Sequence, residues 1–273
     1  MKGGGLFLVG LGPGDLDLMT QRAINILKKM DVLFLEGYTA TLPFVSEQKL
    51  ESVVGQWERA MRPMIENPEK ILEMAQCQNV GIMIVGDPMQ ATTHVDLILR
   101  AKNLGIRTTV IPGISATTMA ISLSGLQSYR FGRQVTIPFN YGDYLPTSPI
   151  EYIFANYNKN LHTLVLLDLD PTGMGIDKPS PMQPAKVVQL LQSMYERLAE
   201  REGTLVETIG LPVKRWNGIL LSDLGTSSQR VVSGNLEELS LIEGGCVHCF
   251  IIPAKLDELE KEMFQQLTID TQV

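Results

Sequence analysis

Apolar runs alternate with amphipathic stretches through the first 120 residues. The short apolar runs that predict buried strands are residues 6–9, 32–35, 80–85 and 108–111. The stretches with apolar residues every three to four positions, which predict helices, are residues 68–76, 92–104 and 117–123. Thr20 is expected to cap a further helix, and Gly105 is expected to end the helix over 92–104. This alternation predicts a parallel sheet covered by helices on both faces, whereas residues 41–64 show no single pattern.

The pattern changes after Gly125. The strands expected in this half are residues 134–138, 162–169, 204–209, 218–222, 229–232 and 247–252. The helices expected are residues 150–158, 185–200 and 256–267. Two of the strands have the spacing of a hairpin, so a mixed sheet is expected rather than a parallel one. We place a domain boundary between Pro112 and Gly132, and we describe the chain as an α/β protein with domains 1–120 and 121–273.

Three turns rich in glycine and proline follow strands of the first half, at residues 10–15, 86–94 and 112–116. In a parallel sheet the carboxyl ends of the strands share one edge, where ligands bind. The three turns are therefore expected to line one cleft of backbone N–H and C=O groups. The first turn, GLGPGD, does not have the spacing of a GxGxxG dinucleotide fingerprint, and a tight connection is its alternative interpretation.

The second turn, GDPMQATTH, has more chemical groups than a connection needs. Asp87 is a candidate to accept a hydrogen bond from a ligand, or alternatively a carboxylate that stabilises the turn before Pro88. Thr92 and Thr93 are candidates either for the site or for capping the next helix. His94 is a candidate for a direct role, although a packed histidine in the first helical turn is the commoner case.

The charge of the chain limits its function classes. It has 23 basic and 30 acidic residues and a net charge of −7, which argues against a general nucleic-acid-binding surface. No apolar run is long enough to span a membrane, and the first residues lack the apolar stretch of a signal peptide. Three cysteines do not make a disulfide framework, which predicts a reducing, cytoplasmic setting.

Two small groups of residues have the chemistry of metal ligands. Cys246, His248 and Cys249 lie close together, but a zinc site needs a second pair of ligands at suitable spacing, so buried strand residues are the favoured interpretation. Asp168 and Asp170 lie two residues apart at a strand end. Two carboxylates alone are equally consistent with solvated strand-end residues. We therefore predict no metal site.

Five segments resemble a known family. VGLGPGD (residues 9–15) and VIPGISA (residues 110–116) resemble motifs of the tetrapyrrole methylase superfamily. Three others resemble the diphthine synthases within that superfamily, and the resemblance extends over nearly the whole chain. These selective segments are GDPMQATTH (86–94), GLQSYRFGR (125–133) and LHTLVLLD (161–168).

The resemblance implies a two-domain tetrapyrrole methylase-like fold, with a parallel-sheet N-terminal domain, a mixed-sheet C-terminal domain and an active-site cleft between them. It implies an S-adenosyl-L-methionine-dependent N-methyltransferase that forms a homodimer. The implied reaction is repeated methylation of the amino group on a 3-amino-3-carboxypropyl-modified histidine of translation elongation factor 2. The product is diphthine, an intermediate of diphthamide biosynthesis.

The resemblance also implies cofactor contacts, but it marks no catalytic residue. The residues that match the S-adenosyl-L-methionine contacts of the family are Pro13, Asp87, Gln90, Ser115, Ala116, Leu167, Gly210 and His248. Arg130 and His94 are further candidates for contacting the carboxylate of the substrate. The first and third turns are also typical of cobalamin-pathway methylases, so a cobalt-precorrin methyltransferase is one alternative. A non-catalytic protein that binds S-adenosyl-L-methionine is another.

Overall fold

The chain forms two compact units. A computed structural model describes residues 3–202 and 209–268. The first unit comprises Met1–Ala116 together with Met174–Pro179 and Gly225–Ser227. The second unit comprises Thr117–Gly173, Ser180–Leu224 and Ser228–Val273. The division into domains 1–120 and 121–273 remains our proposal for how the chain is organised.

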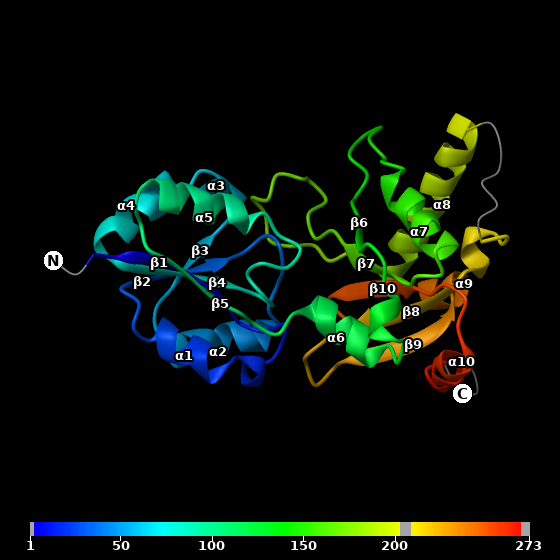
Figure 1. The fold of residues 1–273 in the computed structure, drawn as a ribbon, viewed down its shortest axis with the longest axis horizontal. Helices are drawn as coiled ribbons and strands as arrows, with labels where there is room; N and C mark the ends of the chain where they lie inside the picture. The colour runs from blue at the N-terminus through cyan, green and yellow to red at the C-terminus, as the bar shows by residue number, and fades with distance from the viewer. Residues whose placement is uncertain (1–2, 203–208, 269–273) are drawn as a thin grey trace. The chain divides into compact units, whose positions relative to one another are not determined.

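The first unit is built on a five-stranded parallel sheet in the order β3-β2-β4-β1-β5 (Figure 1). Its strands are β1 (Gly5–Gly10), β2 (Val32–Glu36), β3 (Glu58–Ala60), β4 (Asn79–Ile84) and β5 (Thr108–Ile111). All six residues of β1 are buried because helices cover both of its faces. The predicted parallel sheet is therefore confirmed, and the predicted strands differ from the observed ones by at most one residue at either end.

Helices cover this sheet on both faces. They are α1 (Gln21–Leu27), α2 (Phe44–Val54), α3 (Arg62–Glu66), α4 (Glu69–Cys77) and α5 (His94–Asn103). Figure 1 shows α1 and α2 on one face and α3, α4 and α5 on the other. Alternate strand residues feed two cores: Leu8 packs on the side of α4 and α5, and Val9 packs on the side of α1 and α2. Thr20 caps α1 as predicted, by accepting a hydrogen bond from the Ala23 N–H at 3.1 Å.

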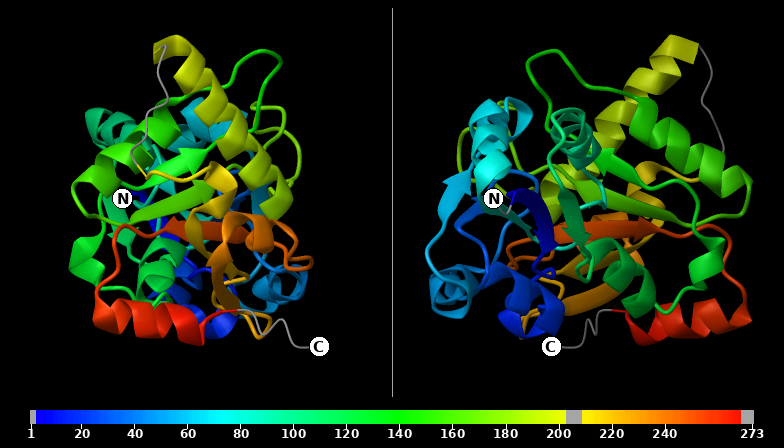
Figure 2. Two further views of the ribbon diagram at one scale, coloured as in Figure 1. Left: turned by 90° about the vertical axis from the view of Figure 1, so that its right-hand side faces the viewer. Right: turned by 60° about the vertical axis from the view of Figure 1, so that its left-hand side comes forward.

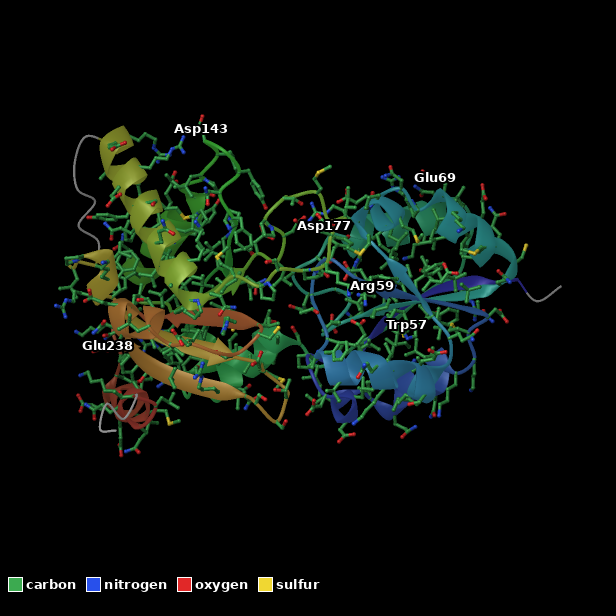
Figure 3. All side chains as sticks on the ribbon, turned by 180° about the vertical axis from the view of Figure 1, so that it is seen from behind. Trp57, Arg59, Glu69, Asp143, Asp177 and Glu238 are labelled. Atoms are coloured by element: carbon green, nitrogen blue, oxygen red, sulfur yellow. The ribbon has the colours of Figure 1, made fainter. Side chains whose placement is uncertain are left out.

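The region without a clear sequence pattern contains α2, the edge strand β3 and α3. β3 has only three residues, too few to show a period of two, and its pairing with β2 defines it. Arg59 lies over the ring of Trp57, with 5.6 Å between its Cζ atom and the ring centroid, and forms an ion pair with Glu47 (Figure 3). A short edge with a charged residue discourages further strand addition.

The second unit contains a five-stranded mixed sheet in the order β6-β7-β10-β8-β9. Its strands are β6 (Val135–Ile137), β7 (Thr163–Leu167), β8 (Asn217–Ser222), β9 (Arg230–Asn235) and β10 (His248–Ile252). Among its described strands only β6 and β7 pair in parallel, and β8 and β9 form the predicted antiparallel hairpin. The mixed sheet is confirmed, whereas most of the strand expected at 204–209 lies outside the described residues.

Helices also flank the second sheet. They are α6 (Ala116–Leu123), α7 (Ser148–Asn158), α8 (Pro184–Glu202), α9 (Leu236–Ser240) and α10 (Glu258–Gln266). The helices α7 and α8 pack on one face, where Phe154 and Trp216 lie edge to face with 5.6 Å between their ring centroids. Figure 2 shows α10 on the other side, next to β9, where the Ser233 N–H donates to the Leu267 carbonyl at 2.8 Å. Among the described residues, no helix combines the length and the apolar character needed to cross a membrane.

Candidate active site

The three predicted turns follow the carboxyl ends of β1, β4 and β5, which are neighbouring strands of the first sheet. The first and second turns are joined by a pair of backbone hydrogen bonds. The Gly86 N–H donates to the Gly12 carbonyl at 2.8 Å, and the Gly12 N–H donates to the Gly86 carbonyl at 3.2 Å. The expectation that the turns share one edge of the sheet is therefore confirmed.

Glycine is required where the turns meet. A Cβ atom on Gly113 would lie 2.1 Å from the Gly86 carbonyl oxygen, and one on Gly10 would lie 2.6 Å from the Gly113 Cα. Both distances are far below any allowed contact, so only a hydrogen atom fits at either position. The close approach of three backbones gathers polar main-chain groups of the three turns at one edge of the sheet, and such groups suit a small polar ligand.

Asp87 ties the second turn to the third. Its Oδ1 accepts a hydrogen bond from the Met89 N–H at 2.9 Å, which stabilises its own loop. Its Oδ2 accepts one from the Gly113 N–H at 3.1 Å, which fixes the third turn. The carboxylate is half-buried. It therefore does more than close a local turn, and no sequence pattern indicated its bond to Gly113.

His94 is the first residue of α5 and is almost completely buried, with 1% of its surface exposed. Its Nδ1 lies 2.8 Å from the Pro88 carbonyl oxygen. Burial lowers the pKa of the imidazole, and the bond to Pro88 offsets only part of that effect. His94 Nε2 and Thr92 Oγ1 are buried without a hydrogen-bond partner. The helix begins two residues later than predicted, and the side chain of Thr93 makes no capping bond.

The other candidates of the first unit lie in or beside the same turns. Pro13 is half-buried, and the Asp15 N–H of the same turn donates to the Gly225 carbonyl at 2.8 Å. Gln90 is exposed in the second turn. Ser115 is buried in the third turn, and Ala116 begins α6. These residues stay candidates for the methyl-donor site.

The three candidates of the second unit lie at strand ends or in a bend. Leu167 is the last residue of β7, opposite Ile137 of β6. Gly210 is exposed in a bend, with a φ of 71° that favours glycine. His248 begins β10 and is 5% exposed, and its Nδ1 lies 2.8 Å from the Ser222 hydroxyl. His248 Nε2 is buried without a hydrogen-bond partner among the described residues.

The two groups with metal-ligand chemistry do not assemble into a metal site. Cys246 is exposed and precedes β10, whereas Cys249 is buried within it, where burial raises the pKa of its thiol to about 12. Asp168 accepts a hydrogen bond from the Tyr141 hydroxyl at 2.6 Å, and Asp170 accepts one from the Thr172 N–H at 2.8 Å. Within residues 3–202 and 209–268, no three His, Cys, Asp or Glu residues form a group suited to a metal ion.

A buried carboxyl group, Glu36, was missed in the sequence. It is the last residue of β2 and is 1% exposed. It accepts hydrogen bonds from the Thr39 N–H at 3.1 Å and from the Thr39 hydroxyl at 2.6 Å. Burial is the main cause that raises its pKa to about 7, despite these bonds. Glu36 follows an apolar strand directly, but its burial was visible only after β2 paired on both sides.

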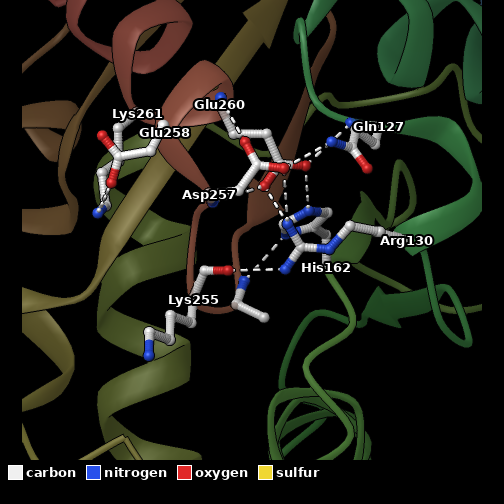
Figure 4. A network of polar contacts seen from close by, with 9 residues as sticks. Gln127, Arg130, His162, Lys255, Asp257, Glu258, Glu260 and Lys261 are labelled. Carbon is white, nitrogen blue, oxygen red and sulfur yellow. Dashed lines mark hydrogen bonds and ion pairs between the residues drawn. The ribbon is translucent and has the colours of Figure 1, made fainter.

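The selective segment 125–133 connects to the C-terminal helix (Figure 4). The Gln127 N–H donates to the Glu260 carboxylate at 3.1 Å, and the Gln127 side chain donates to Asp257. Arg130 forms an ion pair with Glu260 and donates to the Lys255 carbonyl at 2.7 Å. The structure therefore ties the Arg130 guanidinium group to Glu260 and to the Lys255 carbonyl, and its contact with the substrate stays a prediction.

Glu260 and His162 complete this network, which we name the α10 clasp: Gln127, Arg130, His162, Asp257 and Glu260. His162 Nδ1 accepts the Ala254 N–H at 3.0 Å, so its proton is on Nε2, which donates to Glu260 at 3.0 Å. Burial alone would raise the pKa of Glu260, but the surrounding N–H donors outweigh burial and lower it. Burial lowers the pKa of His162 more than Glu260 raises it.

The glycines of the same segment fit close contacts. A Cβ atom on Gly125, where φ is 71°, would lie 2.1 Å from the Met263 Cγ. One on Gly132 would lie 2.3 Å from the Asn156 Oδ1, which accepts the Arg133 N–H at 3.1 Å. The selective segment 125–133 therefore packs against α7 and α10. An Asp-x-x-Glu capping box at 257–260 is visible in the sequence, but its partners are not.

Comparison with known proteins agrees with this geometry. The family described as Tetrapyrrole (Corrin/Porphyrin) Methylases matches residues 5–240. The chain belongs to the tetrapyrrole methylase family. It is therefore a methyltransferase, and the family implies a methyl-donor cofactor. The resemblance noted in the sequence is confirmed, as is the combination of a parallel-sheet unit and a mixed-sheet unit.

The relatives of this methylase match over almost their whole length. A diphthine synthase of Methanocorpusculum labreanum is 36% identical over 264 residues, which cover 96% of this chain and 98% of the relative. A diphthine methyl ester synthase of Saccharomyces cerevisiae is 33% identical, over 97% and 90% of the two chains. A crystal structure of diphthine synthase superposes with a TM-score of 0.82 at 27% identity, over 96% and 95% of the two chains.

Proposed function

We propose that this methylase is a diphthine synthase. In this proposal it transfers methyl groups from S-adenosyl-L-methionine to the amino group of the 3-amino-3-carboxypropyl-histidine of translation elongation factor 2. The observation that carries the proposal is the near full-length similarity to relatives named for diphthine chemistry. The ATTH stretch and the α10 clasp support it, because ATTH and the clasp residues Gln127, Arg130 and His162 come from the segments by which the chain resembles these relatives rather than methylases of macrocycles.

The residues present fit the proposed methyl donor. The joined turns of the first unit offer backbone polar groups where Gly10 and Gly113 allow close approach, and His248 of the second unit has a buried nitrogen without a partner. We assign the contacts of S-adenosyl-L-methionine to the two units separately. The first unit contributes Pro13, Asp87, Gln90, Ser115 and Ala116, and the second contributes Leu167, Gly210 and His248.

The chemistry of the reaction asks the protein mainly to position its substrates. S-adenosyl-L-methionine supplies a methyl group bound to a sulfonium sulfur, and this methyl group is electrophilic without activation by a metal. The protein must hold a neutral amine in line with the methyl–sulfur bond and exclude water from it. Correct placement of two reactants supplies roughly 7–11 kcal/mol of a barrier. The two hydrogen bonds that Asp87 accepts contribute to this positioning, because they fix two turns of the proposed site relative to each other.

The proposal includes the setting of the enzyme. We propose that it acts in the cytoplasm as a homodimer, with elongation factor 2 as its protein substrate and with no nucleic acid or membrane as partner. The net charge of −7 supports the exclusion of a general nucleic-acid partner. Light scattering of the purified enzyme tests the dimer directly, and a monomeric mass would contradict it.

Mass spectrometry tests the proposed reaction. Elongation factor 2 with the aminocarboxypropyl group is incubated with the enzyme and S-adenosyl-L-methionine, and unmodified factor serves as the control. We expect stepwise addition of methyl groups to the modified histidine only. Transfer to a cobalt-precorrin instead would establish the cobalamin-pathway alternative. Binding of S-adenosyl-L-methionine without transfer to either acceptor would indicate a non-catalytic binding protein.

A substitution at Asp87 tests the proposed methyl-donor site. Asp87→Ala removes the acceptor of the Met89 and Gly113 N–H groups, and each charge-assisted hydrogen bond is worth about 1.5–3 kcal/mol. We expect the affinity for S-adenosyl-L-methionine, measured by calorimetry, to fall by more than about tenfold. Asp96→Ala is the matched control, because Asp96 is an exposed carboxylate of α5 that pairs only with Arg100. Unchanged affinity in Asp87→Ala would refute the assignment.

A further inference from the structure

The second turn contains two buried polar atoms that lack a hydrogen-bond partner, Thr92 Oγ1 and His94 Nε2. Such atoms are uncommon in folded proteins, because an unsatisfied buried donor or acceptor costs about 1–3 kcal/mol. Here the two occur within three residues, in the ATTH stretch that follows the Asp87 loop. Their position in one short stretch marks it as a candidate for contact with a ligand.

The bond to Pro88 determines which ligand His94 can bind. A carbonyl oxygen only accepts, so the His94 Nδ1 must donate its hydrogen at 2.8 Å. In the neutral ring, Nε2 then has a lone pair and no hydrogen. Burial keeps the ring neutral by lowering its pKa, and among the described residues no charged side chain contributes to that shift. Only a hydrogen-bond donor can satisfy this nitrogen.

The backbone fixes the place of this nitrogen. Ala91 has a φ of 54°, a left-handed conformation that costs energy for a residue with a Cβ atom. Strain of this kind is concentrated at functional sites, where the surrounding structure maintains it. The segment also runs directly from the loop in which Asp87 ties the second turn to the third. His94 therefore belongs to the carboxyl edge of the sheet, where the proposed methyl donor and amine must meet.

We propose that His94 is the catalytic base of the reaction and that its Nε2 takes a proton from the amine of the substrate, while the Thr92 hydroxyl hydrogen-bonds to the same group. This inference rests on the proposed function. The N–H bond of the substrate ammonium breaks, an Nε2–H bond forms, and the electron pair stays on the amine nitrogen. That pair is then free to form the bond to the methyl carbon. The imidazolium keeps its Nδ1–H bond to Pro88 and gives the extra proton to water that enters the site when the substrate leaves.

The same step serves each round of methylation. An amine with one or two methyl groups becomes an ammonium ion that still has an N–H group for His94 Nε2. A trimethylammonium group has none, so its hydrogen bond to His94 is lost. The base therefore holds every intermediate that must react again and releases the fully methylated group.

A pair of substitutions separates proton transfer from loop positioning. In His94→Asn the side-chain amide lies near the position of Nδ1 and can donate to Pro88, but the variant has no atom at Nε2. We expect it to bind S-adenosyl-L-methionine with unchanged affinity. We expect its single-turnover rate to fall about 100-fold or more near neutral pH, the loss typical of a missing general base. The rate should then rise with pH, as the amine loses its proton to solvent, whereas the wild-type rate should be flat.

His94→Gln and Thr92→Val complete the set. His94→Gln places an amide near Nε2 and loses the bond to Pro88, so it should weaken S-adenosyl-L-methionine binding, whereas His94→Asn should not. Thr92→Val should slow transfer less than His94→Asn. Asp96→Asn, on the exposed face of α5, is the control and should leave rate and affinity unchanged. If His94→Asn has the wild-type rate and pH profile, or loses cofactor affinity, the inference is wrong.

A direct measurement keeps the test independent of folding defects in the variants. The chain has three histidines, so nitrogen NMR of labelled wild-type enzyme resolves each imidazole. Without the methyl donor, modified elongation factor should shift the His94 Nε2 signal, and unmodified factor should not. The absence of a shift would overturn the inference. If the wild-type enzyme does not methylate the factor, the proposed function fails; if it does and only the His94 results differ, the inference alone fails.

Discussion

Glu260 should be among the most sensitive positions of the second unit. Its side chain is fully buried and accepts hydrogen bonds from the backbone of Gln127 at 3.1 Å and of Asp257 at 3.2 Å. It also accepts one from His162 at 3.0 Å and forms an ion pair with Arg130. Glu260→Gln keeps the size of the side chain but removes its charge and one of its two acceptor oxygens. Arg130 then loses its buried charged partner, and at least one N–H donor loses its acceptor.

The expected magnitude follows from that loss. Removing one partner of a buried ion pair costs about 3–5 kcal/mol, because the other charge remains buried and unpaired. In a domain of roughly 150–250 residues each kcal/mol lowers the melting temperature by about 2–4 °C. The transition of the second unit should therefore move down by about 6–20 °C. Arg130 retains the Lys255 carbonyl and the more distant Asp257, which places the result toward the lower end of this range.

Tryptophan fluorescence measures this transition separately. The chain has two tryptophans, Trp57 in the first unit and Trp216, buried, in the second. In a Trp57→Phe background the signal of Trp216 reports on the second unit alone. Glu258→Gln is the matched control, since Glu258 is fully exposed two residues away and pairs with Lys261. A shift in Glu260→Gln no larger than that of the control would refute the role assigned to the clasp.

Three further predictions follow from the described contacts. Gly113→Ala places a Cβ 2.1 Å from the Gly86 carbonyl, so calorimetry should show at least a tenfold loss of S-adenosyl-L-methionine affinity. Gly105→Ala is the control, because Gly105 has open space around it, and this variant should lose only about 1 kcal/mol of stability. Glu36→Gln should stabilise the first unit near pH 8 and not near pH 4. The rise of the Glu36 pKa from 4.5 to about 7 lowers the free energy of unfolding of the wild type by up to about 3 kcal/mol, an effect that is absent below pH 4.5 and complete above pH 7. Equal urea midpoints for the variant and the wild type at pH 8 would contradict this. The second unit should lose stability as the pH falls below 6.5. Burial lowers the pKa of His162 and His248, so the unfolded chain binds more protons than the folded one in this range. A urea unfolding midpoint, followed by Trp216 fluorescence, that stays constant down to pH 5 would contradict this.

Much of the fold was readable from local patterns. Runs such as residues 80–85 are buried strands because they are apolar throughout, and the helix after Thr20 begins where its hydroxyl caps the backbone. These features depend on residues within a few positions of one another. The short strand β3 escaped prediction because three residues show no period, and pairing with β2 creates it.

The sequence also placed the three turns at one edge of a sheet, because parallel strands require it. Only the tertiary structure decided what their residues do. Asp87 bonds to Gly113, 26 positions away, and Arg130 pairs with Glu260, 130 positions away. Neither spacing has a period that a sequence reveals. The tautomer of His94 depends in the same way on the Pro88 carbonyl, which the folded loop brings to 2.8 Å. Motifs along the chain therefore identified the family, whereas contacts across it connected Asp87 to the third turn, Arg130 to α10 and His94 to the Pro88 carbonyl.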